Sequence, residues 1–190
     1  MLNKIKSKPK LYLSAATVIL LISYYAWAKF TSPSGDQKVT YTPSAKQCFS
    51  IDEPLPWKYC VHVPSDGKPN GSVAYLLHGR NLDENIWNDD TFYTAMIQRY
   101  WQDRKVSPPT IVTVSFGKIW LLAPKGKSEK SGLAETFENA VIPEVEKRIG
   151  KPTSRIIFGE SMGGLNALLL ALQKPTLFQK VASLCPGLYT

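Results

Sequence analysis

The chain has 190 residues, of which 44% are hydrophobic and 20% are charged, a composition that suits one globular domain with a buried core. The formal net charge is +8, but four of the 23 basic residues are lysines within the first ten positions, and the others exceed the 15 acids by only four. The later basic residues are scattered, and their one local cluster, at 125–130, contains a glutamate. No nucleic-acid partner is therefore expected, because such a surface needs a basic stripe with interleaved aromatic residues.

Residues 1–28 have the pattern of a secretory signal peptide. The lysine-rich stretch MLNKIKSKPK precedes an apolar run at 11–28, and this run ends in the small-residue pattern Ala26-Trp27-Ala28, which is typical of a cleavage site. The alternative is an uncleaved signal anchor, because the apolar run reaches the lower length limit for a membrane span. In both cases the rest of the chain is expected to be exported, to the periplasm or beyond, and membrane contact is expected only through 11–28 when the segment stays uncleaved.

The segment at 29–46 is polar and rich in Ser, Thr and Pro, which predicts a linker that leads into a domain at 47–190. Within that domain, WKYCVHVP at 57–64 alternates as a half-buried strand does. Cys48 and Cys60 would lie on neighbouring strands if the stretch between them folds back as a hairpin. Export would then favour a disulfide between Cys48 and Cys60, and the sequence leaves open whether this bond forms.

Strand and helix patterns alternate along the rest of the chain, after a predicted turn at 65–71. Buried strands are predicted at 72–79, 110–116 and 155–159, a final strand at 180–185, and helices at 83–104, 132–149 and 162–173. Pro143 is expected to kink the second of these helices or to force a local adjustment, and Cys185 is expected to be a buried small hydrophobic residue. The alternation predicts an α/β fold with a mostly parallel sheet, helices on both faces and an N-terminal antiparallel hairpin.

Ser161 lies between a strand-like and a helix-like run in RIIFGESMGGLNALLLAL, residues 155–172. The residues around it fit G-x-S-x-G, a motif whose serine sits on a strained strand-to-helix turn. Gly159 and Gly163 lack the β-carbons that would collide with the neighbouring strand and helix, so the backbone can bend and the hydroxyl can point outward. The pattern therefore predicts that Ser161 is a nucleophile. The alternative is a glycine-rich turn that binds nothing or holds a phosphate; the dinucleotide motif G-x-G-x-x-G is absent.

A serine that attacks a carbonyl also needs hydrogen-bond donors for the oxyanion. The N–H of Met162 is the first predicted donor, since it begins the helix that follows the nucleophile. The second is expected from the loop after an earlier central strand, where Gly79 permits a sharp turn and the N–H of Arg80 follows. His78, at the end of that strand, is expected to orient the loop by hydrogen bonding rather than to act as the catalytic base.

No metal or other cofactor is expected. His62 and His78 are the only histidines, and Cys60-Val61-His62 is not by itself a zinc-binding spacing. Trp87, Trp101 and Trp120 are expected to pack in the interior, and the alternative is that they line a cleft for an aromatic or apolar acyl group.

Four stretches resemble the putative-esterase family of α/β-hydrolases: YLLHGR, PPTIVTV, NAVIPEVEKR and GESMGGLNALLLALQKPTLFQKVASLCPGL. This family includes S-formylglutathione hydrolase, feruloyl and enterochelin esterases, and the mycolyltransferases. The resemblance runs from about residue 47 to the last residue and is most specific at Ser-Met-Gly-Gly and His-Gly. It implies an α/β-hydrolase fold, a Ser–Asp/Glu–His triad, no cofactor and acyl-ester chemistry. It also implies that Ser161 occupies the nucleophile position, and Arg80 and Met162 the oxyanion-hole positions.

The acid and the histidine of that triad have no counterpart where the fold should provide them. Both follow the nucleophile in the chain order of this fold, yet no aspartate, glutamate or histidine occurs after Glu160. His62 is expected at the far edge of the sheet, and without a base the hydroxyl of Ser161 is a weak nucleophile. We expect a fragment of a longer enzyme that lacks the C-terminal part of the fold. The alternative is a complete product that has lost its catalytic half and exposes the edge of its last strand.

The leading hypothesis is an exported serine hydrolase that cleaves carboxylic esters of a small molecule, a lipid or a sugar through an acyl-enzyme on Ser161. One alternative is an acyltransferase of the same fold, in which an alcohol replaces water as the acceptor. The other is a catalytically inactive hydrolase-like fragment or binding protein. The incomplete triad predicts that these 190 residues alone are inactive.

Overall fold

The computed structural model of the protein describes residues 9–31, 44–53, 55–64, 68–88, 92–119 and 133–187. Four sequence features lie wholly or partly outside these residues: the linker predicted at 29–46, the turn predicted at 65–71, the basic cluster at 125–130 and Trp120. The chain divides into two compact units, residues 1–39 and residues 40–190.

The first unit contains the helix α1 (Pro9–Thr31). The apolar run at 11–28 is helical throughout, and the helix ends three residues beyond it. Its apolar side chains at 18–22 are exposed. Nowhere in the described part of the chain does a helix combine the length and the apolar character needed to cross a membrane.

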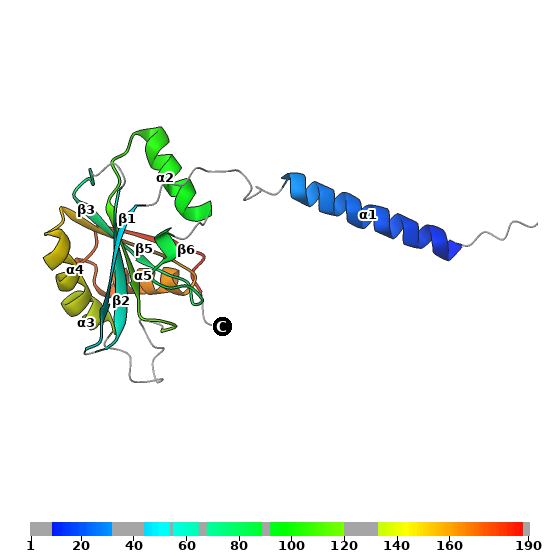
Figure 1. Ribbon diagram of the computed structural model, residues 1–190. Coiled ribbons are helices and arrows are strands. Elements are labelled where there is room, and N and C mark those ends of the chain that lie inside the picture. The colour runs from blue at the N-terminus through cyan, green and yellow to red at the C-terminus, as the bar shows by residue number, and fades with distance from the viewer. Residues whose placement is uncertain are drawn as a thin grey trace, which may run out of the picture. The chain divides into compact units, whose positions relative to one another are not determined.

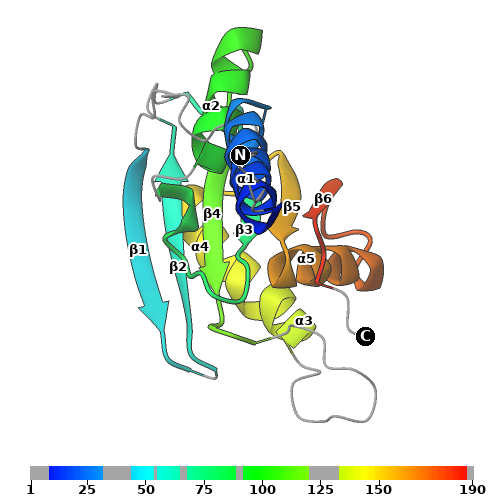
Figure 2. The ribbon, with the colours of Figure 1, turned by 90° about the vertical axis from the view of Figure 1, so that its right-hand side faces the viewer.

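The second unit is built on a mixed sheet, which has six strands in the described residues. These are β1 (Ala45–Ile51), β2 (Trp57–Val63), β3 (Ser72–Leu77), β4 (Thr110–Ser115), β5 (Ser154–Glu160) and β6 (Lys180–Leu184). They lie in the order β1-β2-β4-β3-β5-β6, which Figure 2 shows from one edge of the sheet to the other. The pairs β1–β2 and β2–β4 are antiparallel, and all other pairs are parallel. The predicted mostly parallel sheet with an N-terminal antiparallel hairpin is confirmed.

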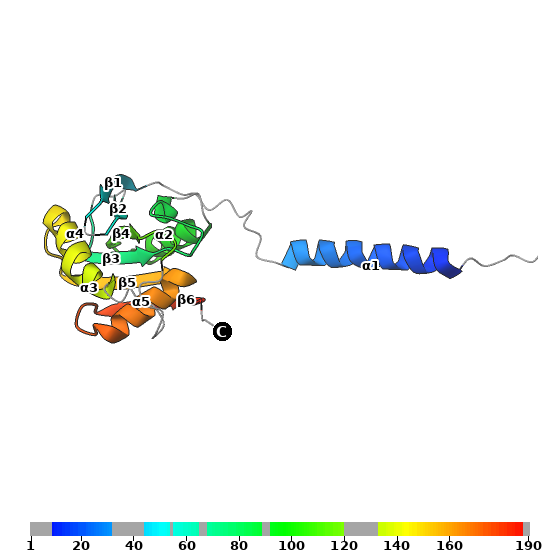
Figure 3. The same ribbon diagram turned by 90° about the horizontal axis from the view of Figure 1, so that it is seen from below.

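Helices cover both faces of the sheet, with α3 and α4 on one side of the strands and α2 on the other (Figures 1 and 3). One face carries α3 (Leu133–Thr136), the π-helix η2 (Phe137–Val141), α4 (Ile142–Ile149) and α5 (Met162–Gln173), and the other carries the 3-10 helix η1 (Ile86–Asn88) and α2 (Phe92–Arg104). The division follows from the alternation of side chains along a strand. On β3, Val73 and Tyr75 join the core beneath the first set of helices, and Ala74 and Leu76 join the core beneath the second.

The segment at 133–149 shows how the chain accommodates a proline inside a helix. Phe137, Val141 and Val145 recur every fourth residue, are fully buried and form a stripe that faces the core. Pro143 is the second residue of α4 and directly follows the wide π-turn η2. A proline has no N–H to donate to the carbonyl four residues earlier, and the π-turn is the local adjustment that the sequence predicted.

The helix predicted at 83–104 is shorter in the structure, because α2 begins only at Phe92. The side chain of Asp83 accepts a hydrogen bond from the N–H of Asn85 at 2.8 Å. Such a side-chain turn competes with helix formation, and a single 3-10 turn follows it. The prediction of an α-helix was therefore wrong for residues 83–88.

The three cysteines form one pair and one free thiol. Cys48 and Cys60 lie opposite each other in the register of β1 and β2 and form a disulfide. Cys185 is free and exposed, so the expectation that it is buried is wrong. It directly follows β6, an edge strand whose side chains are mostly exposed, and its φ of 42° lies in the left-handed region.

Candidate active site

The carboxyl ends of β3 and β5 meet at the same end of the sheet. The two strands are parallel neighbours, and Leu77 pairs with Gly159 close to the end of each. The loop at 78–85, which follows β3, and Ser161, which follows β5, therefore start side by side. In an open parallel sheet this end of the strands is where ligands bind.

Ser161 occupies a strained turn between β5 and α5. Its φ of 51° and ψ of −117° lie outside the regions that a residue with a β-carbon prefers, a conformation that costs about 1–3 kcal/mol. The turn is held through the main chain, because the N–H of Ser161 donates to the carbonyl of Leu184 at 2.9 Å and its carbonyl accepts from Leu165 and Gly187. The side chain makes no capping hydrogen bond to α5 and the residue is exposed. The hydroxyl is thus available at the surface.

Two glycines allow this turn to form. A β-carbon on Gly163 would lie 2.0 Å from the carbonyl oxygen of Leu77, and one on Gly159 would lie 2.4 Å from the carbonyl oxygen of Gly163. Both distances are far below van der Waals contact, so α5 approaches β3 and β5 backbone to backbone. This is the steric role that the sequence assigned to Gly159 and Gly163.

His78 holds the start of the 78–85 loop. The ring is 3% exposed, its Nδ1 lies 2.7 Å from the carbonyl oxygen of Gly79, and its Nε2 lies 2.8 Å from Oγ of Ser115. Since a carbonyl can only accept, Nδ1 carries the proton and Nε2 accepts from the hydroxyl of Ser115. Both ring nitrogens are engaged, so His78 orients the loop and is not available as a base, in agreement with the sequence prediction.

Arg80 follows directly at the tip of a tight turn. The carbonyl of Gly79 accepts the N–H of Leu82 at 3.0 Å and closes this turn. A β-carbon on Gly79 would lie 3.7 Å from Cβ of Ser161, so the turn and the serine are in contact. Within the described residues, the N–H of Arg80 donates to no backbone acceptor. Met162 is the first residue of α5, where an N–H has no partner inside the helix.

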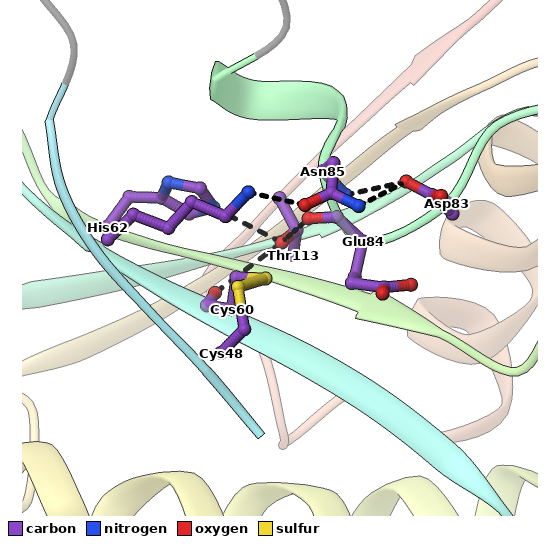
Figure 4. The surroundings of a disulfide bond; sticks show 8 residues. Cys48, Cys60, His62, Asp83, Glu84, Asn85 and Thr113 are labelled. Carbon is purple, nitrogen blue, oxygen red and sulfur yellow. Dashed lines mark hydrogen bonds between the residues drawn. A yellow bond between two sulfur atoms is a disulfide. The ribbon is translucent and has the colours of Figure 1, made fainter. Parts of the chain in front are cut away.

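The 78–85 loop is supported from beneath by side chains of β1 and β4 (Figure 4). The hydroxyl of Thr113, a fully buried residue on β4, donates to the carbonyl of Glu84 and lies 3.3 Å from Nε2 of His62. Lys46 on β1 donates to the side chain of Asn85. Lys46 and Thr113 could not be recognised as supports from the sequence, because their partners are distant along the chain and no local motif marks them.

A cavity of about 390 Å³ lies beside this loop. Its lining includes Asp83 and Glu84 from the loop, Trp57 from β2, and Ser115 and Gly117 at the end of β4. Ser115 is also the hydroxyl that His78 binds. The cavity therefore opens at the same end of the sheet as Ser161 and is large enough for a small organic group.

Neither histidine of the chain is placed to activate Ser161. His62 lies on β2, and β4 and β3 stand between that strand and β5. His78 is engaged through both nitrogens, as described above. Among the described residues, no group of three or more His, Cys, Asp or Glu side chains could hold a metal ion.

Comparisons with known proteins agree with this geometry. Residues 54–190 match the family described as "Putative esterase". The chain is 27% identical over 176 residues to an endo-1,4-beta-xylanase/feruloyl esterase of Xylanibacter ruminicola, a match that covers 87% of this chain and 23% of that protein. It is 32% identical over 123 residues to a diacylglycerol acyltransferase/mycolyltransferase of Mycobacterium leprae, which covers 63% of this chain and 37% of the relative. The chain thus spans less than half the length of these two relatives.

Solved structures show the same fold. A ferulic acid esterase from the anaerobic fungus Anaeromyces mucronatus superposes with a TM-score of 0.58 at 15% identity, over 77% of this chain and 60% of that one. An S-formylglutathione hydrolase from Agrobacterium tumefaciens gives a TM-score of 0.51 at 18% identity over the same shares. The fold is that of the α/β-hydrolases, and the family match covers most of the described second unit. The chain belongs to the putative-esterase family.

Proposed function

We propose that this chain carries the nucleophile and the oxyanion hole of a serine hydrolase that cleaves carboxylic esters. The observation that carries the proposal is the conformation of Ser161, an exposed serine with a φ of 51° at the junction of β5 and α5. A strained serine at this point of an α/β sheet presents its hydroxyl to a substrate. The N–H groups of Arg80 and Met162 are the proposed donors to the oxyanion.

In the proposed reaction, Oγ of Ser161 attacks the carbonyl carbon of the ester while a base takes the hydroxyl proton. The carbonyl oxygen becomes an oxyanion, which the two N–H groups stabilise. The bond to the alcohol then breaks, the alcohol leaves with the proton, and water releases the acid from the acyl-enzyme by the same steps. Since His62 and His78 are both held elsewhere, the proposed base is a histidine from a segment that these 190 residues do not contain.

The substrate class is proposed from the relatives and from the cavity beside the 78–85 loop. A feruloyl esterase is among the relatives, and the cavity of about 390 Å³ has an aromatic side chain, Trp57, in its lining. An ester of an aromatic acid is therefore the first substrate to examine. Acyl transfer to an alcohol is the second candidate, which the likeness to a mycolyltransferase favours. Hydrolysis of methyl ferulate with and without an added sugar alcohol would separate the two.

We also propose that the protein is exported through the N-terminal segment. The lysines of residues 1–10 and the apolar run at 11–28 support this proposal, and so does the Cys48–Cys60 disulfide, because such bonds persist mainly in oxidising compartments. The mass of the mature protein recovered from a bacterial periplasm checks it. A protein that stays in the cytoplasm at full length would refute export.

The nucleophile is tested with a fluorophosphonate probe, which labels activated serines. Without its own base the chain should label slowly, and added imidazole should accelerate labelling by taking the proton, since the oxyanion hole retains part of the catalysis when a triad member is missing. The Ser161→Ala variant should stay unlabelled under both conditions, while Ser107→Ala, at an exposed position near the opposite end of the sheet, should label like the parent. Equal labelling of Ser161→Ala, or no imidazole-dependent labelling of the parent, would refute the proposal and support a non-catalytic binding protein.

A further inference from the structure

A second cavity, of about 330 Å³, lies at the opposite end of the sheet from Ser161. It is lined in part by Ile111, which lies at the start of β4. The first residue of β4, Thr110, pairs with Val73 near the start of β3, whereas Ser161 follows the last residue of β5. A strand rises about 3.3 Å per residue, so roughly 15–20 Å of sheet separates the two places. The proposed esterase site does not use this cavity.

Two tryptophans form its aromatic side. Trp87 is 1% exposed, its ring stands edge-on to Phe158 of β5, and its centroid lies 5.8 Å from that of Trp101. Trp101 on α2 is only half-buried and also lines the cavity. Both residues were expected to pack in the interior, with a cleft for an aromatic or apolar acyl group as the alternative. In the structure Trp87 is a buried core residue that also lines the cavity. Trp101 is half-buried, packs against the core cluster that contains Trp87, and lines the cavity as well.

Polar side chains and apolar residues share the remaining sides, and the apolar ones include Val106, Pro108 and Pro109. Gln98 and Gln102 line the cavity with Trp101 and follow one face of α2 at helical spacing, and Lys105, which directly follows the helix, also lines the cavity. Lys105 has a φ of 51°, and the N–H of the next residue returns to the carbonyl of Trp101 at 2.9 Å. The helix therefore ends in a tight left-handed turn at the cavity. The buried imidazole of His62 completes this set.

This combination restricts the class of ligand. A purely apolar ligand would cover the half-buried amide of Gln98 without offering it a hydrogen-bond partner, which costs binding energy. An anion would find a single lysine, Lys105, which is exposed. A ring with an apolar C–H face and an edge of hydroxyl groups matches both sides, because the C–H face packs on an indole and the hydroxyls both donate to and accept from side-chain amides. The volume is at the lower end of the range for small-molecule sites.

From this arrangement we infer that the cavity binds a sugar unit, one or two pyranose rings in size, independently of Ser161. The inference does not rest on the proposed esterase activity. A carbohydrate held here would be anchored at one end of the sheet while the other end remains open to an ester.

The test is a titration of the full 190-residue chain with D-xylose, D-glucose and xylobiose, followed by calorimetry and by tryptophan fluorescence. A compact ligand of this size is expected to bind with a dissociation constant of roughly 0.1–10 mM. Gln98→Ala and Trp101→Ala should each weaken binding about tenfold or more. Tyr100→Ala, at a position on α2 that is 57% exposed and outside the cavity lining, should bind like the parent. Because Trp101 packs on Trp87, circular dichroism of each variant checks its fold, and Gln98→Ala carries the test if Trp101→Ala unfolds.

Two further arms make the result decisive. Ser161→Ala should bind the sugars unchanged, because Ser161 lies at the far end of the sheet, and benzoate should bind no better than the sugars. No saturable binding of any of the three sugars would overturn the inference. So would loss of binding in Ser161→Ala, or binding of benzoate alone, since these outcomes would identify a substrate subsite or an aromatic-anion site. Failure of the esterase proposal would leave the sugar titration unaffected.

Discussion

Removing the Cys48–Cys60 disulfide should destabilise the second unit. The size of the loss depends on the number of residues between the two cysteines. The bond closes a loop with a sequence separation of 12. In the chain-entropy description, releasing a loop of this length increases the freedom of the unfolded state and costs about 3 kcal/mol at 25 °C. For a unit of this size the same loss corresponds to a decrease in Tm of about 6–12 °C.

The assay is urea unfolding of the parent with and without dithiothreitol, beside a variant with Cys48→Ala and Cys60→Ala. Reduction keeps every side chain in place and breaks only the cross-link, so the two arms separate chain entropy from packing. Cys185→Ser, at an exposed position, should change stability by no more than about 0.5 kcal/mol. If the reduced parent unfolds at the same urea concentration as the oxidised parent, the entropic argument is refuted.

Loss of the Cys48–Cys60 disulfide should also increase amide hydrogen exchange in the 78–85 loop. Lys46 on β1 donates a hydrogen bond to Asn85, and among the described strands β1 lies at the edge of the sheet and pairs with β2 alone. Freeing β1 from β2 should therefore raise amide hydrogen exchange in the loop more than in the central strand β4. Equal changes in the loop and in β4 would contradict this coupling.

Three other results are expected. Gly163→Ala should cost about 3 kcal/mol or more, because the added carbon would overlap the backbone of β3; a thermal melt checks this, and a Tm equal to that of the parent would show that the close approach is absent. Thr113→Val should raise amide exchange in the 78–85 loop about tenfold by removing the hydrogen bond to Glu84, and Thr113→Ser should restore protection. Burial, assisted by the Glu144 hydrogen bond, raises the pKa of Tyr59 to about 12 from 10.0. The protonated phenol therefore stabilises the fold fully below pH 10, and this contribution is lost as the pH rises towards 12. In urea unfolding, the free energy of unfolding of Tyr59→Phe should decrease less than that of the parent as the pH rises from 10 to 12. An equal decrease in both proteins would contradict this role of Tyr59.

The strand-to-helix turn at Ser161 could be predicted because all of its determinants are local. The apolar strand, the glycines at 159 and 163 and the apolar helix are contiguous in the sequence, and their steric requirements act within a few residues. The same holds for the local adjustment near Pro143. Patterns of this kind report which face of an element is buried, but the prediction of a half-buried strand at 57–64 was wrong, because β2 also buries Cys60 and His62 on its other face.

The order of the strands could not be predicted, because the placement of β4 between β2 and β3 depends on contacts between distant segments. The supports of the 78–85 loop have the same origin. Lys46 and Asn85 are 39 residues apart, and Thr113 and Glu84 are 29 apart, so no local pattern relates them. The wrong prediction for Cys185 has a related cause, since an apolar run does not reveal whether any element covers it.

The backbone contact at Gly163 has a consequence for how the two halves of the site keep their spacing. Where α5 meets the end of β3, peptide groups touch without any intervening side chain. Most contacts between secondary-structure elements loosen as temperature rises because side chains change rotamer. The contact at Gly163 contains no side-chain atoms, so rotamer changes cannot loosen it. The separation between the serine and the turn that begins at Gly79 is therefore fixed by atomic radii and covalent geometry. It should remain constant while the surrounding side chains vary widely.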